Sequence, residues 1–78
     1  MIAAAIRELA QHRGPGKTLC PSEVARALAP DDWRVLMPEV RRTADALAAA
    51  GEIVVMQKGK AVSACTARGA IRIGLKAP

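Results

Sequence analysis

The side chains best able to do chemistry in this 78-residue chain are cations gathered in two stretches. Guanidinium and ammonium groups suit the phosphates of nucleic acid, which dominate protein–DNA affinity. The pattern therefore predicts contacts to double-stranded DNA. Three candidate contacts lie in a helical stretch and three in a later, basic one: Arg34, Arg41, Arg42, Lys58, Lys60 and Arg68.

The positive charge is concentrated in the last third of the chain. The net charge is +5, of which residues 1–50 carry +1 and residues 51–78 carry +4. A basic patch of this kind indicates a nucleic-acid partner when it lies on one surface, and a solvated face otherwise. Both interpretations stay open from the sequence.

Recognition of a particular DNA sequence is not indicated. Base edges are read by Arg, Asn, Gln or Ser side chains aimed into a groove. The outward face of residues 38–50 places Glu39 and Asp45 beside its arginines, and these acids repel phosphate. We expect weak binding with low sequence specificity.

Catalytic chemistry has little support. Cys20 precedes a predicted helix, whose N-terminus favours a thiolate, but Glu23 is close and cysteine often serves as a small buried apolar residue. His12 has no neighbouring serine, cysteine or carboxylate arrangement. With Cys65 the only other cysteine, no CxxC and one histidine, we expect free thiols, no metal, no cofactor, no small-molecule substrate and no enzyme activity.

The first half of the chain predicts two helices joined by a short extended segment. Apolar residues recur at helical spacing in residues 1–13, and Gly14 with Pro15 ends that helix. Residues 17–20 suit an extended conformation. The second helix begins at Pro21, where Glu23 can reach back to a free backbone N–H, and it ends at Pro30.

The segment that contains the third helix should carry three of the candidate cations. Because proline removes an internal hydrogen bond, we expect a short turn at 33–36 and a main helix from near Pro38 to Gly51. On its wheel one face is apolar, whereas Arg41, Arg42 and Asp45 face outward. Trp33, the sole aromatic residue, is expected to pack in the core, with an interface role as the alternative.

The remaining residues predict a hairpin. Residues 53–56 are rich in β-branched side chains, and apolar residues alternate over 71–75. The basic loop between them, residues 57–70, is here called the wing. Helix, short strand, two helices and a hairpin is the order of a winged helix, so we expect one α+β domain over residues 1–78, with a helix-turn-helix core and a C-terminal β-hairpin wing.

Several segments of the chain form a recognisable pattern: CPSEVAR at 20–26, WR, LMP and VR within 33–41, GEI at 51–53 and GAIRI at 69–73. Together they resemble a small bacterial family of domains of unknown function with a winged-helix-like fold. The resemblance implies the fold and no activity, ligand or catalytic residue. The family leads us to expect proline where Ala70 stands.

Two arginines in these segments have a structural interpretation. Arg26 and Arg72 are expected to cover apolar surface with their stems and to pair with Glu23, Glu52 or Asp31.

The composition also leaves room for a protein partner. Of 40 apolar residues, 17 are alanine, so the core is small and a second subunit would help to stabilise it. The alternative function is therefore a protein-interaction or homodimerisation module that packs through an alanine-rich helix face. Neither a signal peptide nor a membrane-spanning run is recognisable, so we expect a cytoplasmic protein that has no contact with membranes.

Overall fold

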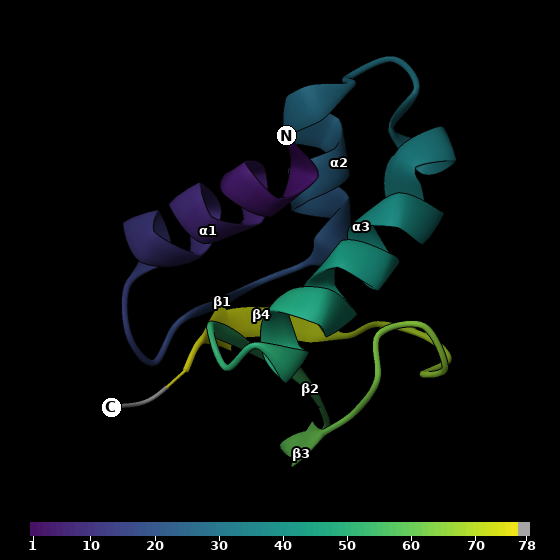
Figure 1. Cartoon of the computed structure of the whole chain (residues 1–78). Helices are drawn as coiled ribbons and strands as arrows, with labels where there is room; N and C mark the ends of the chain where they lie inside the picture. The colour runs from purple at the N-terminus through teal and green to yellow at the C-terminus, as the bar shows by residue number, and fades with distance from the viewer. Residues whose placement is uncertain (77–78) are drawn as a thin grey trace.

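Three helices lie on one side of a small antiparallel sheet in the computed structural model, which describes residues 1–76 (Figure 1). The helices are α1 (Ile2–Arg13), α2 (Pro21–Leu28) and α3 (Trp33–Ala49). The strands are β1 (Thr18–Leu19), β2 (Ile53–Gln57), β3 (Lys60–Ala61) and β4 (Arg72–Leu75).

The end of the first helix and the start of the second lie where predicted, whereas the second helix ends at Leu28, before the predicted Pro30. α1 stops before Gly14, which takes the positive φ of 85° that glycine adopts without strain. α2 starts at Pro21, and Oε2 of Glu23 accepts a hydrogen bond from the Cys20 backbone N–H at 2.7 Å. Local capping chemistry therefore fixes both boundaries.

The predicted break in the third helix is wrong: α3 runs without interruption through Pro38. Proline there removes a single hydrogen bond, the one its N–H would donate to the carbonyl of Arg34. In compensation, half-buried Trp33, Leu36 and Met37 pack against the core from the first turns of the helix. Burial of these side chains outweighs the lost bond.

The sheet has the strand order β1-β4-β2-β3, and every neighbouring pair is antiparallel. The predicted pairing of the last two apolar segments is confirmed, with Val55 opposite Ile73. The short extended segment after α1 is also a strand, in which Leu19 lies opposite Ile73 on the other edge of β4. Because β4 follows the wing and β1 precedes α2, their pairing places the end of the wing beside the start of α2.

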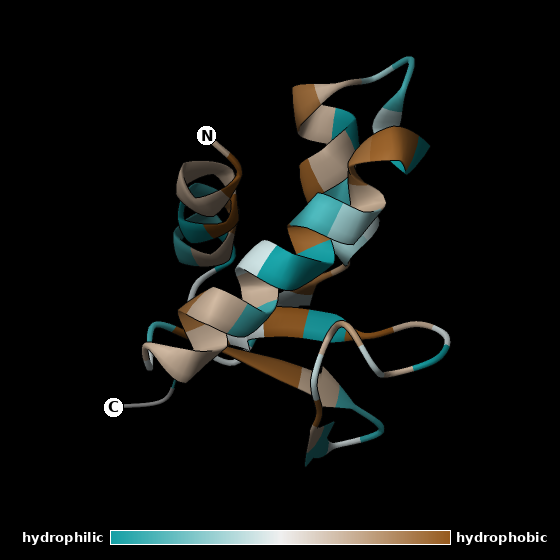
Figure 2. Cartoon of the chain, turned by 45° about the vertical axis from the view of Figure 1, so that its right-hand side comes forward, coloured by the Kyte–Doolittle hydropathy of each residue, from teal (hydrophilic) through white to brown (hydrophobic). Residues whose placement is uncertain are grey.

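The core fills the space between the helices and the sheet. Its side chains come from every helix, from β1, β2 and β4, and from Ala64 and Ile71 beside the strands. Figure 2 shows hydrophobic residues in the strands of the sheet and along the helices. The fold is α+β, with three helices and an antiparallel sheet in an arrangement compatible with a winged helix. The largest buried side chains are Ile6, Leu19, Ile53, Ile71, Ile73, Val24 and Val40.

Candidate nucleic-acid interface

A tight turn at the tip of the β2–β3 hairpin exposes the two wing lysines. Gln57 lies opposite Lys60, so Lys58 and Gly59 alone form the turn, with φ values of 52° and 80°. Two positive φ angles are the signature of a type I′ turn, whose twist suits a hairpin. Lys58 and Lys60 are exposed as a result.

The rest of the wing is fastened to α3 through its backbone. The Arg41 guanidinium donates hydrogen bonds to the carbonyl oxygens of Ala64 at 2.8 Å, Ala67 at 3.3 Å and Gly69 at 3.2 Å. Arg41 was expected to face outward, toward DNA, but in this structure its donors are directed at the wing. Its charge remains, while its hydrogen-bonding capacity is largely used inside the molecule.

Asp45 holds the same segment in place by accepting hydrogen bonds from it. Its Oδ1 accepts from the backbone N–H of Ala64 at 2.6 Å, and its Oδ2 accepts from Ser63 Oγ at 2.7 Å and from the Cys65 N–H at 3.0 Å. Burial raises the pKa of Asp45, but these hydrogen bonds outweigh burial and hold the pKa below its ordinary value. The predicted outward orientation of Asp45 is therefore wrong, because the wing lies over this side of α3. We call Arg41 and Asp45 together the wing clamp.

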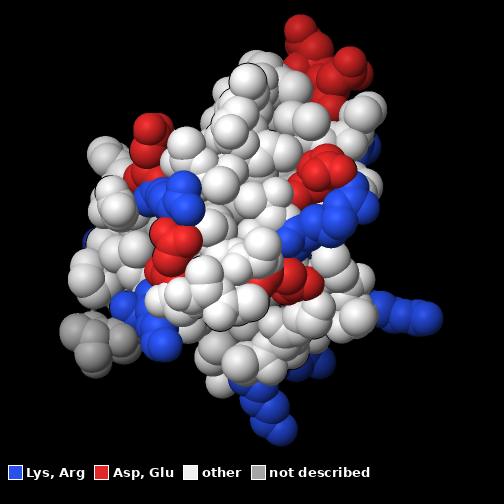
Figure 3. All heavy atoms as spheres, viewed as in Figure 1, with Lys and Arg blue, Asp and Glu red and all other residues white. Residues whose placement is uncertain are grey.

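Gln57 adds a third attachment at the far end of the wing. Its Nε2 donates to the carbonyl oxygens of Arg68 at 2.6 Å and Ala70 at 3.2 Å. The Arg68 side chain is exposed. Lys58, Lys60 and Arg68 thus project from a wing whose backbone is held in place. Figure 3 shows several Lys and Arg side chains extending from the lower part of the molecule, where the sheet and wing lie.

The other two candidate contacts lie on α3 in different surroundings. Arg42 forms an ion pair with Glu39, and both side chains are more than half exposed. The Arg34 guanidinium lies 4.4 Å from the centre of the Trp33 ring, as does that of Arg26. Arg34 and Arg42 are eight residues apart, roughly 12 Å along the helix axis.

The structure therefore brings the candidate cations together only in part. The wing supplies three exposed cations, and the ion pairs formed within residues 1–76 involve other residues. The clamp was not predictable from local sequence, because its contacts join residues 18 to 28 positions apart. The alternation of charged and apolar residues along α3 does not indicate that Arg41 and Asp45 bind the wing.

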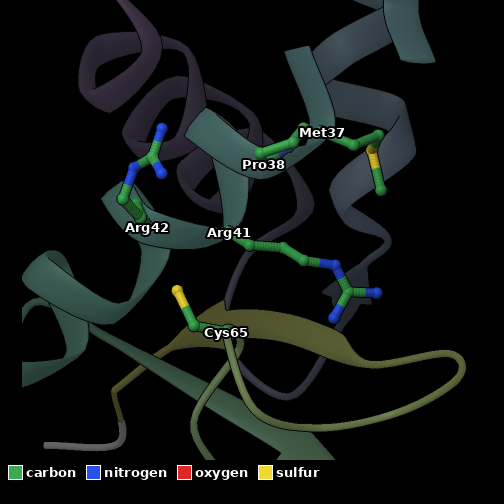
Figure 4. Close-up of a pocket in the computed structure, with 5 residues that line it drawn as sticks. All are labelled: Met37, Pro38, Arg41, Arg42 and Cys65. Carbon is green, nitrogen blue, oxygen red and sulfur yellow. The ribbon is translucent and has the colours of Figure 1, made fainter. Parts of the chain in front are cut away.

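An open pocket of about 410 Å³ lies where α3 meets the wing (Figure 4). The Cys65 side chain points toward α3, whereas the side chains of Arg41 and Arg42 leave the helix in different directions. Asp45 raises the pKa of the Cys65 thiol, mainly by hydrogen bonding to it, and so disfavours the thiolate. The lining of the pocket, which includes Met37 and Pro38, has no pair of cations that converge on one point.

Cys20 and Cys65 are both free thiols, as expected. The Cys20 sulfur accepts a hydrogen bond from Nη1 of Arg72 at 2.8 Å. Arg72 also donates from Nε to Thr18 Oγ1 at 2.8 Å, so it joins β4 to β1. Its expected pairing with a carboxylate is wrong.

The carboxylates expected to pair with Arg26 and Arg72 have other partners. Glu52 pairs with Arg7 at 2.8 Å, and Glu23 pairs with Arg13. Both arginines lie on α1. Arg26 instead lies over the Trp33 ring. Trp33 is half-buried, so it packs against the core and also carries exposed cations on its surface.

Within residues 1–76, no group of three or more His, Cys, Asp or Glu side chains is placed to hold a metal ion. In the same residues, every helix is too short or too polar to cross a membrane. Residues 1–76 match the model of a family described as a protein of unknown function (DUF3253). Comparison with curated proteins gave no match.

Proposed function

Because the chain belongs to the DUF3253 family, a family of unknown function, its role must be inferred from its own residues, and we propose that it binds double-stranded DNA through its wing. The binding is weak and has low sequence specificity. The observation that supports this most is the set of three exposed wing cations: Lys58 and Lys60 on a tight hairpin turn, and Arg68 in the segment that Arg41 and Asp45 hold to α3.

A wing held in place favours phosphate binding for an entropic reason. A loop that is already ordered loses less conformational freedom when it meets a ligand. The cations also lack carboxylate partners among residues 1–76, so phosphate does not have to displace one. Three phosphate contacts predict that log K falls against log salt with a slope of roughly −3.

The side chains of α3 and the acidic residues before it are consistent with low sequence specificity. Arg41 is engaged by the wing, and Arg42 is paired with Glu39. Asp31 and Asp32 lie just before the N-terminus of α3, the end that inserts deepest in helix-turn-helix complexes. Acidic side chains there repel the phosphates on either side of a groove, so α3 contributes little direct reading of bases.

We propose that the chain is a binding protein of the cytoplasm rather than an enzyme. Two free thiols suit a reducing compartment. Homodimerisation through the alanine-rich face remains a prediction; on that face Ala46 and Ala49 are exposed.

The proposal is tested by titrating a short DNA duplex into isotope-labelled protein and measuring the changes in the backbone amide chemical shifts. We expect shifts at Lys58, Lys60 and Arg68 at low salt that vanish at high salt. Lys60→Ala should weaken binding and make the salt slope about one unit less steep. Lys17→Ala is the matched control, an exposed lysine outside the wing that should leave the slope unchanged. Wing amides that do not move at low salt would refute the proposal.

A further inference from the structure

The side of α3 opposite its core-facing side is exposed and carries an apolar centre. At 100° per residue, Val35, Pro38 and Arg42 fall within about 60° of one another. All three are exposed, and the Val35 side chain is one of the two large hydrophobic side chains most open to solvent, at 73%. The buried residues of α3 lie on the opposite side: Val40, Ala44 and Leu47.

Acidic residues mark one end of this face, and Arg42, which forms an exposed ion pair with Glu39, marks the other. Asp31 and Asp32 precede the helix and are exposed, and Arg42 lies about three turns further along. Figure 3 shows acidic side chains gathered at the end of the molecule where α2 meets α3. We call the face formed by Asp31, Asp32, Val35, Pro38 and Arg42 the α3 stripe.

The order of groups along the α3 stripe makes it complementary to itself when reversed. If two stripes meet antiparallel about a two-fold axis, Val35 of each copy faces Pro38 of the other. The acidic end of each then faces Arg42 of the other. This is the reciprocal contact that a symmetric dimer requires.

Neither the wing nor DNA fits the stripe as well as a second copy does. The wing clamp holds the wing beside the later part of α3, through Arg41 and Asp45, and the hydrophobic start of the helix stands away from the sheet (Figure 2). The acidic end repels phosphate. A second copy places its acidic end beside Arg42, whose ion pair with Glu39 is more than half exposed, and also covers Val35.

From this charge complementarity we propose that the α3 stripe binds the α3 stripe of a second copy of the chain. This inference goes beyond DNA binding and does not depend on it. About three turns of helix from each copy bury less than the roughly 1,200 Å² typical of stable complexes, so the dimer is weak and forms at high concentration. It would present two wings related by a two-fold axis.

Sedimentation velocity of the whole chain, from about 10 µM to 1 mM and at low salt, tests the pairing. The mass should rise from 8.2 kDa toward twice that value as concentration increases. Arg42→Glu makes both ends acidic, and Asp31→Lys with Asp32→Lys makes both ends basic. Each variant should raise the dissociation constant roughly tenfold, because like charges then face each other across the axis.

Mixing the two variants gives the sharpest readout. Every contact between an acidic stripe and a basic one is attractive, so the mixture should associate where neither variant does alone. The triple variant that carries all three substitutions should also dimerise. Circular dichroism confirms that each variant is folded; Asp32 makes no side-chain capping bond, so its replacement spares the helix.

Lys60→Glu is the matched control, since it changes the net charge as Arg42→Glu does but lies on the wing. It should leave the dimer intact while weakening duplex binding. A wild-type mass of 8.2 kDa at every concentration would overturn the pairing, as would a mixture that stays monomeric. If the monomer's Val35 amide shifts on addition of duplex, the stripe faces DNA instead. Wing shifts in the same titration report separately on the proposed function.

Discussion

Removing the carboxylate of Asp45 should loosen the wing and destabilise the whole domain. Asp45→Ala deletes the acceptor of three hydrogen bonds, from Ser63 Oγ and from the backbone N–H groups of Ala64 and Cys65. Ser63 and Cys65 are exposed, so water can replace the carboxylate there. Ala64 is fully buried, and its N–H is left without a partner.

The magnitude follows from that buried donor. An unsatisfied buried N–H costs about 1–3 kcal/mol, and the two exposed bonds add a few tenths each. We therefore expect the free energy of unfolding to fall by about 2 kcal/mol. For a domain of this size, 1 kcal/mol corresponds to roughly 4–8 °C in Tm, so the variant should melt about 8–16 °C below the wild type.

Thermal unfolding followed by circular dichroism measures the loss, and hydrogen exchange locates it. The amides of residues 64–67 should lose protection in Asp45→Ala more than those of α1 do. Glu8→Ala is the matched control, because Glu8 is exposed and the ion pairs within residues 1–76 do not include it. Its Tm should stay within about 3 °C of the wild type.

The effect should also depend on pH. The folded-state pKa of Asp45 is depressed, so its contribution is fully present above the unfolded pKa of about 4. It is lost as pH falls through the lower folded value. The Tm difference between wild type and Asp45→Ala should thus be large at pH 7 and shrink in acid. An Asp45→Ala variant with the same Tm as the wild type at pH 7 would refute the role of Asp45 in stabilising the wing.

Two further outcomes follow from the site. Cys65, although exposed, should react with a thiol reagent at pH 8 more slowly than an ordinary cysteine because Asp45 raises its pKa; Asp45→Asn should speed the reaction, as read by mass spectrometry, and an unchanged rate would count against the contact. Trp33→Ala should lower the unfolding free energy by about 2 kcal/mol, less than for a buried tryptophan because the ring is only half-buried, and a chemical denaturation curve that matches the wild type would show that its packing is dispensable.

Local signals in the sequence were enough to predict most of the fold. Gly14, Pro21 and Glu23 mark helix ends through backbone chemistry that depends on near neighbours, and the alternation after Gly51 marks the strands. Pro38 misled the prediction because its local penalty is outweighed by packing against residues distant in the sequence.

The candidate site was less predictable for the same reason. Lys58, Lys60 and Arg68 are exposed, in keeping with their place in a basic loop. Arg41 and Asp45 looked equally free on a helical wheel, but the wing returns to α3 and engages both. A wheel shows which way a side chain points and not which later segment meets it.

The wing clamp recognises main-chain atoms almost exclusively. Arg41 binds three carbonyl groups, and two of the three donors to Asp45 are backbone N–H groups. The shape of the segment therefore depends on α3, while the exposed side chains of Thr66 and Arg68 make no contact with the clamp. Substitutions at these two positions change the surface of the wing without changing its backbone, so the same frame can carry different binding specificities.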